Sequence, residues 1–245
     1  CLLEVASDRL DGVVDTDHRW ICTGERFREQ VRASVPGIDD EHVLGEPCGR
    51  DTLNAVGLTA AVLARRDPDA IFAVLTADHV IEPQAVFAER LDAGFKLVEA
   101  DPRRLVTFAI TPTRPASEYG YVEQGDAIDG APGCFEAARF VEKPDRETAE
   151  AYLETGRFAW NSGMFVFHAG TVLDAIGRYE PATRDGLDRI ASHWDDGRRT
   201  ATLDAIYPDL RKISVDYGLI EPAGGDPSLT ICTVPMDVSW IDVGS

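Results

Sequence analysis

Basic residues are scarce in this sequence. Of its 245 residues, 24 are Lys or Arg and 43 are Asp or Glu, which gives a net charge of −19. Such an acidic excess repels nucleic-acid phosphates, and no run of Lys or Arg offsets it locally, so we expect no binding of DNA or RNA. Nucleotides are not excluded as ligands, because a divalent cation and a few basic side chains can neutralise their phosphates.

Paired cysteines and long apolar runs are also lacking. The five cysteines are odd in number and form no CxxC pair, which argues against a zinc site or a disulfide framework and favours free thiols. No apolar stretch reaches the length of a membrane span, and no signal peptide is visible. We therefore expect a cytoplasmic protein that does not bind membranes.

Apolar periodicity predicts alternating helices and strands in the first half of the chain. A helix with Leu53 and Leu63 on its core face begins at Asp51 or Thr52, which would cap it. Two unbroken apolar runs predict parallel strands buried on both sides, at residues 70–75 and 105–110. This rhythm predicts an α/β fold on a doubly wound, mostly parallel sheet, the Rossmann-like arrangement.

The sequence pattern changes after Thr111, where turn-forming residues become frequent. Strands are expected at residues 119–124, 135–141, 164–167 and 229–234. Residues 179–207 read as charged helices that cover the periphery of the molecule. We find no repeat and no linker, so we predict a single domain over residues 1–245 with an elaborated second half.

Two aspartates stand where ligands commonly bind. In open parallel sheets, ligand sites lie beyond the carboxyl ends of the strands, and Asp78 follows the run at residues 70–75. Asp242 follows the strand at 229–234 and its turn, so both carboxylates could ligate a hard cation. Each alone is more simply a turn or cap residue, and only a fold that joins them makes a metal site. His79, beside Asp78, is the one histidine near this position.

Polar groups at two other strand ends suit a phosphate and a sugar. Pro144 stops a strand and starts a helix, which leaves Lys143 at a rim where its ammonium can meet a phosphate or simply face solvent. Asn161 lies between Trp160 and a turn of small residues. Its amide offers both donors and acceptors to sugar hydroxyls, although an Asx turn explains it equally well.

Three further features are ambiguous when taken singly. Gly120 before Tyr121 could let a ligand approach the backbone, or could mark a strand bulge. Residues 46–52 link a strand to a helix N-terminus, where free N–H groups favour an anion or a base edge. Asp216 could be stabilised by a helix dipole or could bind sugar or metal. No Ser–His–Asp or Cys–His arrangement supports a covalent nucleophile.

The order of these motifs is more specific than any one of them. The chain resembles the mannose-1-phosphate guanylyltransferase family of sugar nucleotidyltransferases over almost its whole length. The motifs that carry the resemblance are Glu46-Pro47 with Arg50-Asp51-Thr52, Thr76-Ala77-Asp78-His79, Tyr119-Gly120-Tyr121, Phe140-Val141-Glu142-Lys143-Pro144, Trp160-Asn161-Ser162-Gly163-Met164-Phe165, Ser214-Val215-Asp216-Tyr217 and Trp240-Ile241-Asp242-Val243-Gly244-Ser245.

This resemblance implies roles for individual residues. Asp78 and Asp242 would hold Mg²⁺, and Lys143 would contact the sugar phosphate, which makes these three the expected catalytic residues. The substrate-binding residues would be Glu46, Arg50 and Thr52 beside the guanine nucleotide, Gly120, Tyr121, Glu142 and Asn161 beside the hexose, and Asp216 near the sugar or the metal.

The implied reaction joins GTP and mannose 1-phosphate into GDP-mannose and pyrophosphate, by in-line attack without a covalent enzyme intermediate. The chain could also form a homo-oligomer. Two alternatives stay open, namely another hexose 1-phosphate or nucleoside triphosphate as substrate, and a regulatory homologue that senses GDP-mannose without catalysis.

The sequence departs from the family pattern in one major respect. The Gly-rich loop that wraps the triphosphate, expected near the N-terminus, is absent, and so is the usual C-terminal extension. Cys1 lies directly inside an apparent helix and Ser245 follows an aromatic–acidic turn. We therefore expect that the domain is truncated at both ends and that the chain as written could be inactive for lack of that loop.

Overall fold

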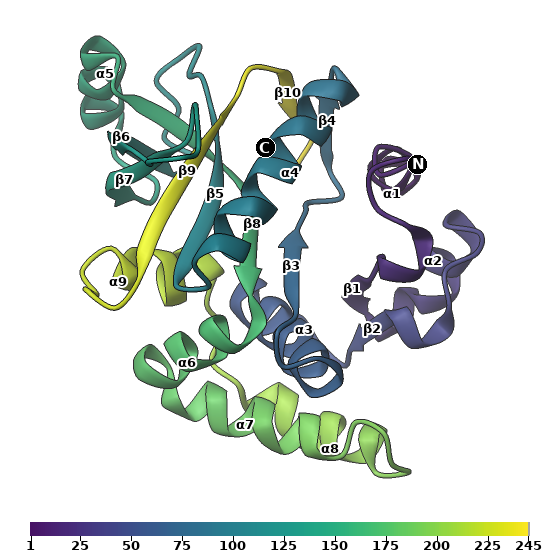
Figure 1. Ribbon diagram of the computed structural model, residues 1–245. Coiled ribbons are helices and arrows are strands. Elements are labelled where there is room, and N and C mark those ends of the chain that lie inside the picture. The colour runs from purple at the N-terminus through teal and green to yellow at the C-terminus, as the bar shows by residue number, and fades with distance from the viewer. Residues whose placement is uncertain (245) are drawn as a thin grey trace. The chain divides into compact units, whose positions relative to one another are not determined.

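The computed structural model describes residues 1–244; Ser245, the last residue of the closing motif, lies outside them. Within the described chain, the residues divide into two compact units (Figure 1). The first unit comprises Cys1–Ala70 and Ala169–Leu219, and the second comprises Ile71–His168 and the stretch from Ile220 onward. Each unit is described by itself below.

The first unit is mainly helical. Its elements are α1 (Leu2–Asp8), η1 (Thr16–His18), β1 (Ile21–Gly24), η2 (Glu25–Phe27), α2 (Arg28–Ser34), η3 (Asp40–His42), β2 (Val43–Glu46), α3 (Thr52–Arg66), α6 (Ala169–Tyr179), α7 (Pro181–Ser192), α8 (Arg199–Ile206), η4 (Tyr207–Asp209) and the start of η5 (Asp216–Ile220). Strands β1 and β2 pair in parallel, with Ile21 opposite Val43.

Helix α3 organises the first unit. It begins as predicted, because the Asp51 side chain caps it by accepting a hydrogen bond from the Thr52 N–H. Helices α6 and α7 pack against it (Figure 1). The closest approach is at Gly57, where an added Cβ would lie 2.6 Å from Leu187 and 3.1 Å from Ile176. Any larger residue at position 57 would displace the Leu187 and Ile176 side chains.

The second unit is built on a sheet. Its elements are β3 (Ile71–Val74), β4 (His79–Glu82), α4 (Gln84–Ala100), β5 (Arg104–Ile110), β6 (Tyr121–Ala127), β7 (Phe135–Val141), α5 (Arg146–Thr155), β8 (Phe158–His168), α9 (Glu221–Ala223), β9 (Thr230–Met236) and β10 (Ser239–Asp242). Among residues 1–244, six strands form one sheet in the order β3-β8-β5-β9-β7-β6, and β4 pairs with β10 in a separate ribbon.

The predicted α/β class is confirmed, and the strand pairings add a correction. The sheet is mixed: β5 and β9 run in parallel, whereas β8 is antiparallel to β3, β5 and β6, and β7 is antiparallel to β6 and β9. The chain therefore runs in the same direction in β3, β5, β9 and β6. Most strands that are hydrogen-bonded to each other are nevertheless antiparallel. The cause is the long strand β8, which separates β3 from β5.

Strand β3 was expected to be central and buried on both sides, and this expectation is wrong. It lies at one end of the sheet order, and only Phe72 of its four residues is buried. Strand β5 is buried as expected, since all residues from Leu105 to Ile110 are enclosed. Helix α4 covers a face of β5, β8 and β9 (Figure 1). Burial of Phe108 against α4 contributes roughly 1.5–3 kcal/mol to folding.

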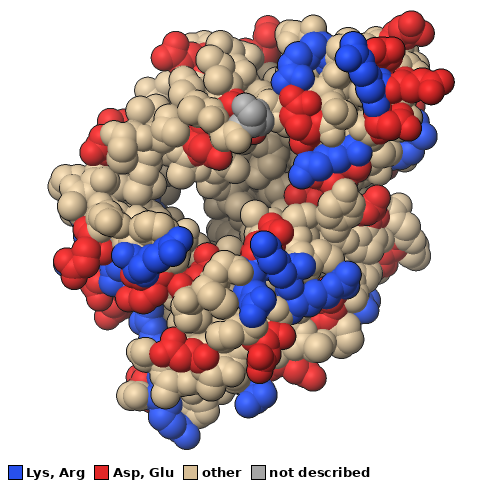
Figure 2. Space-filling model, turned by 180° about the vertical axis from the view of Figure 1, so that it is seen from behind, with Lys and Arg blue, Asp and Glu red and all other residues tan. Residues whose placement is uncertain are grey.

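Surface charges of opposite sign are interspersed. Figure 2 shows Lys and Arg standing among Asp and Glu on the face that it draws. All five cysteines fall within the described residues and are free thiols, and burial raises the pKa of Cys232 to about 12. No helix between residues 1 and 244 combines the length and the apolar character needed to cross a membrane.

Candidate functional site

Three side chains of types that can ligate a metal ion lie close together in the second unit. One ligand atom each from Asp78, His79 and Asp242 falls within 4.8 Å of the others. Asp78 stands in the turn between β3 and β4, as predicted from its place after an apolar run. The structure thus brings together the two carboxylates that the sequence could not join.

The ribbon of β4 and β10 explains this meeting. The strands are antiparallel, with His79 opposite Asp242 and Ile81 opposite Trp240. Because side chains alternate along a strand, these four residues project from the same face of the ribbon. Asp242 was expected in a turn, and it is instead the last residue of a paired strand. The Val243 N–H extends the pairing by donating to the Asp78 carbonyl over 3.1 Å.

Gly244, just after the end of β10, packs against the carboxylates of Asp78 and Asp242. Its N–H donates to Asp242 Oδ1 over 2.8 Å. A Cβ at this position would lie 2.9 Å from Asp78 Oδ2 and 3.2 Å from Asp242 Oδ1. A larger residue at position 244 would therefore displace the Asp78 carboxylate. The Asp78 side chain is about half exposed, at 52%, so the carboxylates are accessible to a solvated cation.

His79 is the enclosed member of the cluster, with 5% exposure. Its Nδ1 receives the Trp240 indole N–H over 3.2 Å. Its Nε2 lies 3.9 Å from Asp78 Oδ1. The chemistry of the donor set fits a hard divalent cation, since two carboxylates of separate strands supply oxygen ligands.

Three predicted sugar-site residues also meet in the second unit. The Asn161 N–H donates to the Gly120 carbonyl over 2.8 Å. A Cβ on Gly120 would lie 2.5 Å from Glu142 Oε2 and 3.4 Å from the Asn161 Cβ. Glu142 and Asn161 therefore pack directly against Gly120, and a larger residue at position 120 would displace their side chains.

The amide of Asn161 has a fixed orientation. Its Oδ1 accepts hydrogen bonds from the Gly163 N–H at 3.2 Å and from the Thr107 hydroxyl at 2.7 Å. A backbone N–H can only donate, so the atom facing it must be the amide oxygen. The Asx-turn interpretation agrees with the bond from the Gly163 N–H, which joins Asn161 to the residue two positions on. Asn161 also lies inside β8, opposite Ala109, where the pairing with β5 shifts register. Gly163 has φ +70° two residues later.

Lys143 stands at the rim of this group. Its ammonium lies 3.4 Å from Glu142 Oε1, and its side chain is 55% exposed whereas that of Glu142 is 6% exposed. Lys143 also has φ 44°, an uncommon conformation for a residue with a side chain. The pair thus places a mobile positive charge above a buried carboxylate, at the rim that the sequence predicted.

An aromatic cluster joins the carboxylate group to the sugar group. The Tyr119 ring lies 5.2 Å from that of Trp160 and 5.0 Å from that of Trp240, and the two indoles are 6.1 Å apart. Each ring adjoins a predicted site residue in sequence, namely Gly120, Asn161 or, two positions on, Asp242. The cluster therefore holds the two groups in one rigid neighbourhood.

Tyr121 was expected to bind substrate, and the structure places its ring in the core of the second unit. Its side chain is fully buried. Its hydroxyl accepts the Ala116 N–H over 2.9 Å, and its ring packs against that of Tyr152. Because Gly120 precedes β6, the alternation of the strand turns the next side chain into the core.

The predicted nucleotide segment belongs to the first unit, where residues 207–218 hold it in place. The Val215 N–H donates to Thr52 Oγ1 over 2.9 Å, so the Thr52 hydroxyl has a structural partner and Asp216 adjoins this contact. The buried Asn54 amide donates to the carbonyls of Arg50 at 2.6 Å and Arg211 at 2.8 Å. Within residues 1–244, Arg50 Nε is buried and has no hydrogen-bond partner.

Glu46 opens this segment at the end of β2. Its carboxylate accepts a hydrogen bond from the Tyr207 hydroxyl. Burial raises the pKa of the Glu46 carboxyl, and the Tyr207 hydrogen bond opposes part of that shift. Burial and the Glu46 charge raise the pKa of Tyr207 well above its usual range. A partly buried carboxylate held by a tyrosine is suited to fixing the shape of the segment.

Sequence reasoning missed three supporting residues. Thr107 could have been noticed as a polar residue within an otherwise apolar buried strand. Trp240 lay within a recognised motif, but its partner His79 could be known only from the strand pairing. Tyr207 had no local signal, because Glu46 precedes it by most of the chain.

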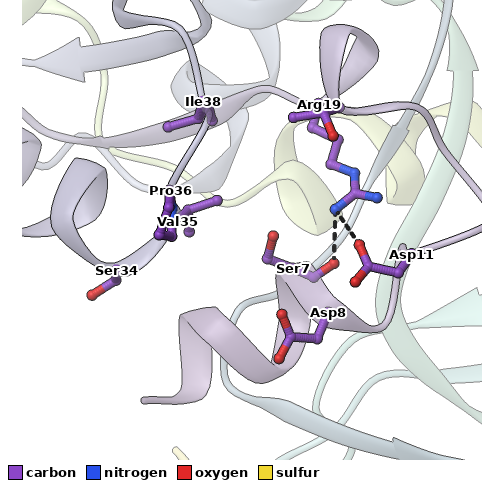
Figure 3. A pocket seen from close by; sticks show the side chains of 9 residues that line it. Ser7, Asp8, Asp11, Arg19, Ser34, Val35, Pro36 and Ile38 are labelled. Atoms are coloured by element: carbon purple, nitrogen blue, oxygen red, sulfur yellow. Dashed lines mark hydrogen bonds and ion pairs between the residues drawn. The ribbon is translucent and has the colours of Figure 1, made fainter.

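A separate hollow of about 170 Å³ lies in the first unit (Figure 3). Arg19 supplies its positive charge, but that charge is already engaged. Its guanidinium donates to the carbonyls of Val14 and Ser7 and lies 3.0 Å from Asp11. In Figure 3 the guanidinium points at Ser7 and Asp11. The hollow therefore does not compete as an anion site.

Comparison with known proteins identifies the family of the chain. The model of the Nucleotidyl transferase family matches residues 19–245. The whole chain is 36% identical to a mannose-1-phosphate guanylyltransferase of Klebsiella pneumoniae and 35% identical to one of Escherichia coli K12, and it covers 51% of each. It thus spans about half the length of these curated relatives.

A solved structure extends the comparison to the fold. The crystal structure of a mannose-1-phosphate geranyltransferase from Thermus thermophilus matches with a TM-score of 0.83 at 31% identity, over 99% of this chain and 66% of that one. The resemblance drawn from the ordered motifs is confirmed by these relatives. The chain belongs to the nucleotidyl transferase family.

Proposed function

We propose that the protein of which this chain is part transfers GMP from GTP to mannose 1-phosphate, giving GDP-mannose and pyrophosphate. The observation that carries the proposal is the meeting of Asp78 with Asp242, joined through aromatic packing to the group of Gly120, Glu142 and Asn161. Relatives named mannose-1-phosphate guanylyltransferase support the choice of base and sugar.

Mg²⁺ is the cation that we propose for the carboxylate pair. Nucleotidyltransferases generally use divalent cations, and Asp78 and Asp242 supply the hard oxygen ligands that Mg²⁺ prefers. When bound, the cation would offset phosphate charge that two acidic substrates bring to an acidic protein.

Other residues would align the substrates. The exposed ammonium of Lys143 can move to the sugar phosphate as a point charge. Glu142 accepts hydrogen bonds from sugar hydroxyls, and Asn161 holds a fixed amide beside it. The sugar phosphate oxygen attacks the α-phosphorus of GTP in line, so alignment supplies the catalysis and no covalent enzyme intermediate forms.

The segment of residues 46–52 would receive the guanine nucleotide. Support comes from Arg50, whose buried Nε lacks a partner within the described chain, and from the bonds that fix Thr52 and Asn54. We further propose a cytoplasmic location, which suits soluble substrates. A homo-oligomer is compatible with this reaction but no step of it requires one.

A substrate panel tests the proposal on the intact protein. Each of the four nucleoside triphosphates is combined with mannose 1-phosphate or glucose 1-phosphate, and pyrophosphate release is measured. We expect the highest kcat/KM for GTP with mannose 1-phosphate. Another preferred pair would replace the assignment of base or sugar. Binding of GDP-mannose without any pyrophosphate release would identify a sensing protein instead.

Two variants test the cation ligands in the same assay. Asp78→Asn and Asp242→Asn each remove a charged oxygen ligand, and loss of such a contact in the transition state costs several kcal/mol, or at least about a hundredfold in rate. Losses below about tenfold for both variants would contradict the assignment of the two carboxylates. Asp237→Asn, an exposed aspartate near the same ribbon in sequence, is the matched control.

A further inference from the structure

We propose that Trp240 fixes the tautomer of His79, so that His79 supports Asp78 as an N–H donor and does not bind the cation through nitrogen. The inference rests on the cation site of the proposed function and adds a positioning role for two residues. It starts from the bond between the Trp240 indole and His79 Nδ1, 3.2 Å long.

The donor in that bond is unambiguous. An indole nitrogen carries a hydrogen and has no acceptor lone pair, so His79 Nδ1 must be the acceptor. In a neutral imidazole one ring nitrogen is the donor and the other the acceptor. The proton of His79 therefore sits on Nε2, the atom that faces Asp78 Oδ1 at 3.9 Å.

The packing around His79 holds its ring in this orientation. The ring is enclosed, with 5% exposure, and packs edge-on against Trp240 at 75° with centroids 4.9 Å apart. Trp240 is itself clamped by Tyr119 and Trp160. Asp78 is the mobile partner, because its half-exposed side chain can rotate by the short distance that turns the 3.9 Å contact into a hydrogen bond.

This assignment changes the donor set of the cluster. With its proton on Nε2 and its Nδ1 occupied by Trp240, His79 offers no lone pair to a metal. The cluster then binds cations through carboxylate oxygens alone, which favours Mg²⁺ and Mn²⁺ over nitrogen-seeking ions such as Zn²⁺. Groups that orient a metal ligand commonly affect metal affinity by about 10–100-fold.

The first test reads the tautomer without any metal or substrate. The intact protein is labelled with ¹⁵N-histidine, and the His79 ring is assigned by comparison with the His79→Gln variant. At about pH 8 an ordinary imidazole is neutral, and we expect the wild-type ring to carry its proton on Nε2. Trp240→Phe should yield a mixture of tautomers. A wild-type proton on Nδ1, or a Trp240→Phe ring unchanged from wild type, would overturn the proposal.

The second test measures Mn²⁺ binding by calorimetry. We expect Trp240→Phe and His79→Leu to weaken Mn²⁺ binding about tenfold, while Zn²⁺ binding by Trp240→Phe weakens less. His79→Gln keeps an amide N–H near the position of Nε2 and should bind Mn²⁺ nearly as well as wild type. Wild-type Mn²⁺ affinity in His79→Leu would overturn the role of His79.

Two controls keep the tests interpretable. Trp194→Phe makes the same substitution at a buried tryptophan whose indole N–H has no hydrogen-bond partner within residues 1–244, and it should leave Mn²⁺ binding unchanged. Failure of the wild-type protein to bind Mn²⁺ would contradict the cation site and the proposed function. The tautomer measurement on metal-free protein would still decide the role of Trp240.

Discussion

Replacement of Gly120 by alanine should disturb the predicted sugar site. An added Cβ would lie 2.5 Å from Glu142 Oε2 and 3.4 Å from both Asn161 Cβ and Phe140 Cζ. Carbon–oxygen contacts normally begin near about 3.3 Å, so the Glu142 carboxylate must retreat by roughly 0.8 Å, the difference between these two distances. Glu142 is buried, with 6% of its side chain exposed, and has little room to do so.

The expected effects follow from this displacement. Overpacking of this kind costs about 1–3 kcal/mol of stability, and a misplacement near 1 Å at a reacting site can cost about a hundredfold in rate. We therefore expect Gly120→Ala to lower kcat/KM for mannose 1-phosphate by about tenfold to a hundredfold and to leave the KM for GTP within about threefold. Urea unfolding and steady-state pyrophosphate release measure the two effects.

A double-mutant cycle isolates the contact. Glu142→Ala removes the clashing carboxylate, so Gly120→Ala should cost less stability in that background than in the wild type. Activity should not return, since Glu142 itself is lost. Gly197→Ala is the matched control, because nothing lies within 4 Å of its added Cβ. If Gly120→Ala were as stable and as active as Gly197→Ala, the packing of Gly120 against Glu142 could not be as described.

Three further predictions concern other contacts. Gly244→Ala places a methyl group against the carboxylates of Asp78 and Asp242 and should weaken Mn²⁺ binding about tenfold in calorimetry. The unfolding free energy should change little, because the exposed Asp78 side chain can move away. An unchanged Mn²⁺ affinity would contradict the close contact between Gly244 and the two carboxylates. Thr107→Val removes one hydrogen bond to Asn161, worth about 1 kcal/mol, and should raise the KM for mannose 1-phosphate about fivefold. Thr107→Ser keeps the hydroxyl and should restore the KM. Equal KM values in the two variants would refute a role for this hydrogen bond. Burial raises the folded-state pKa of Glu46 above the ordinary value of 4.5, so between these two pKa values the folded state holds a proton that the unfolded state has lost. The stability of the wild type relative to Glu46→Gln should therefore fall as the pH rises through 4.5 and up to the raised pKa. A relative stability that rises over this range in urea unfolding would contradict the sign.

Local pattern was enough to predict much of the site. Asp78 could be located because an apolar run precedes it, and Lys143 because Pro144 ends a strand. The N-cap of α3 followed from Asp51 and Thr52. These features depend on residues close together in sequence, which is where propensity and capping act.

Features that depend on strand pairing were out of reach. Residues 239–242 look like a turn until β4 supplies a partner, and Asp242 then shares a face with His79. The mixed sheet arises because β8, far along the chain, lies between β3 and β5. An apolar strand reads the same whether its neighbour is parallel or antiparallel, so the sequence cannot show this.

Contacts between distant side chains were missed for a related reason. The family resemblance assigned Tyr121 to the hexose, but strand alternation decides where its ring points. Tyr207 holds Glu46 across most of the chain. Burial of the Glu46 carboxylate next to a hydroxyl is a property of the packed unit and leaves no mark on either local sequence.

The carboxylate pair is tested most directly by Mn²⁺ titration of the metal-free intact protein, followed by calorimetry in the wild type, in Asp78→Asn, in Asp242→Asn and in the double variant. Because the two carboxylates form one site, each single variant should lose at least about tenfold in affinity and the double variant should bind little more weakly than either. Single variants that bind Mn²⁺ as tightly as the wild type would mean that Asp78 and Asp242 do not share a cation.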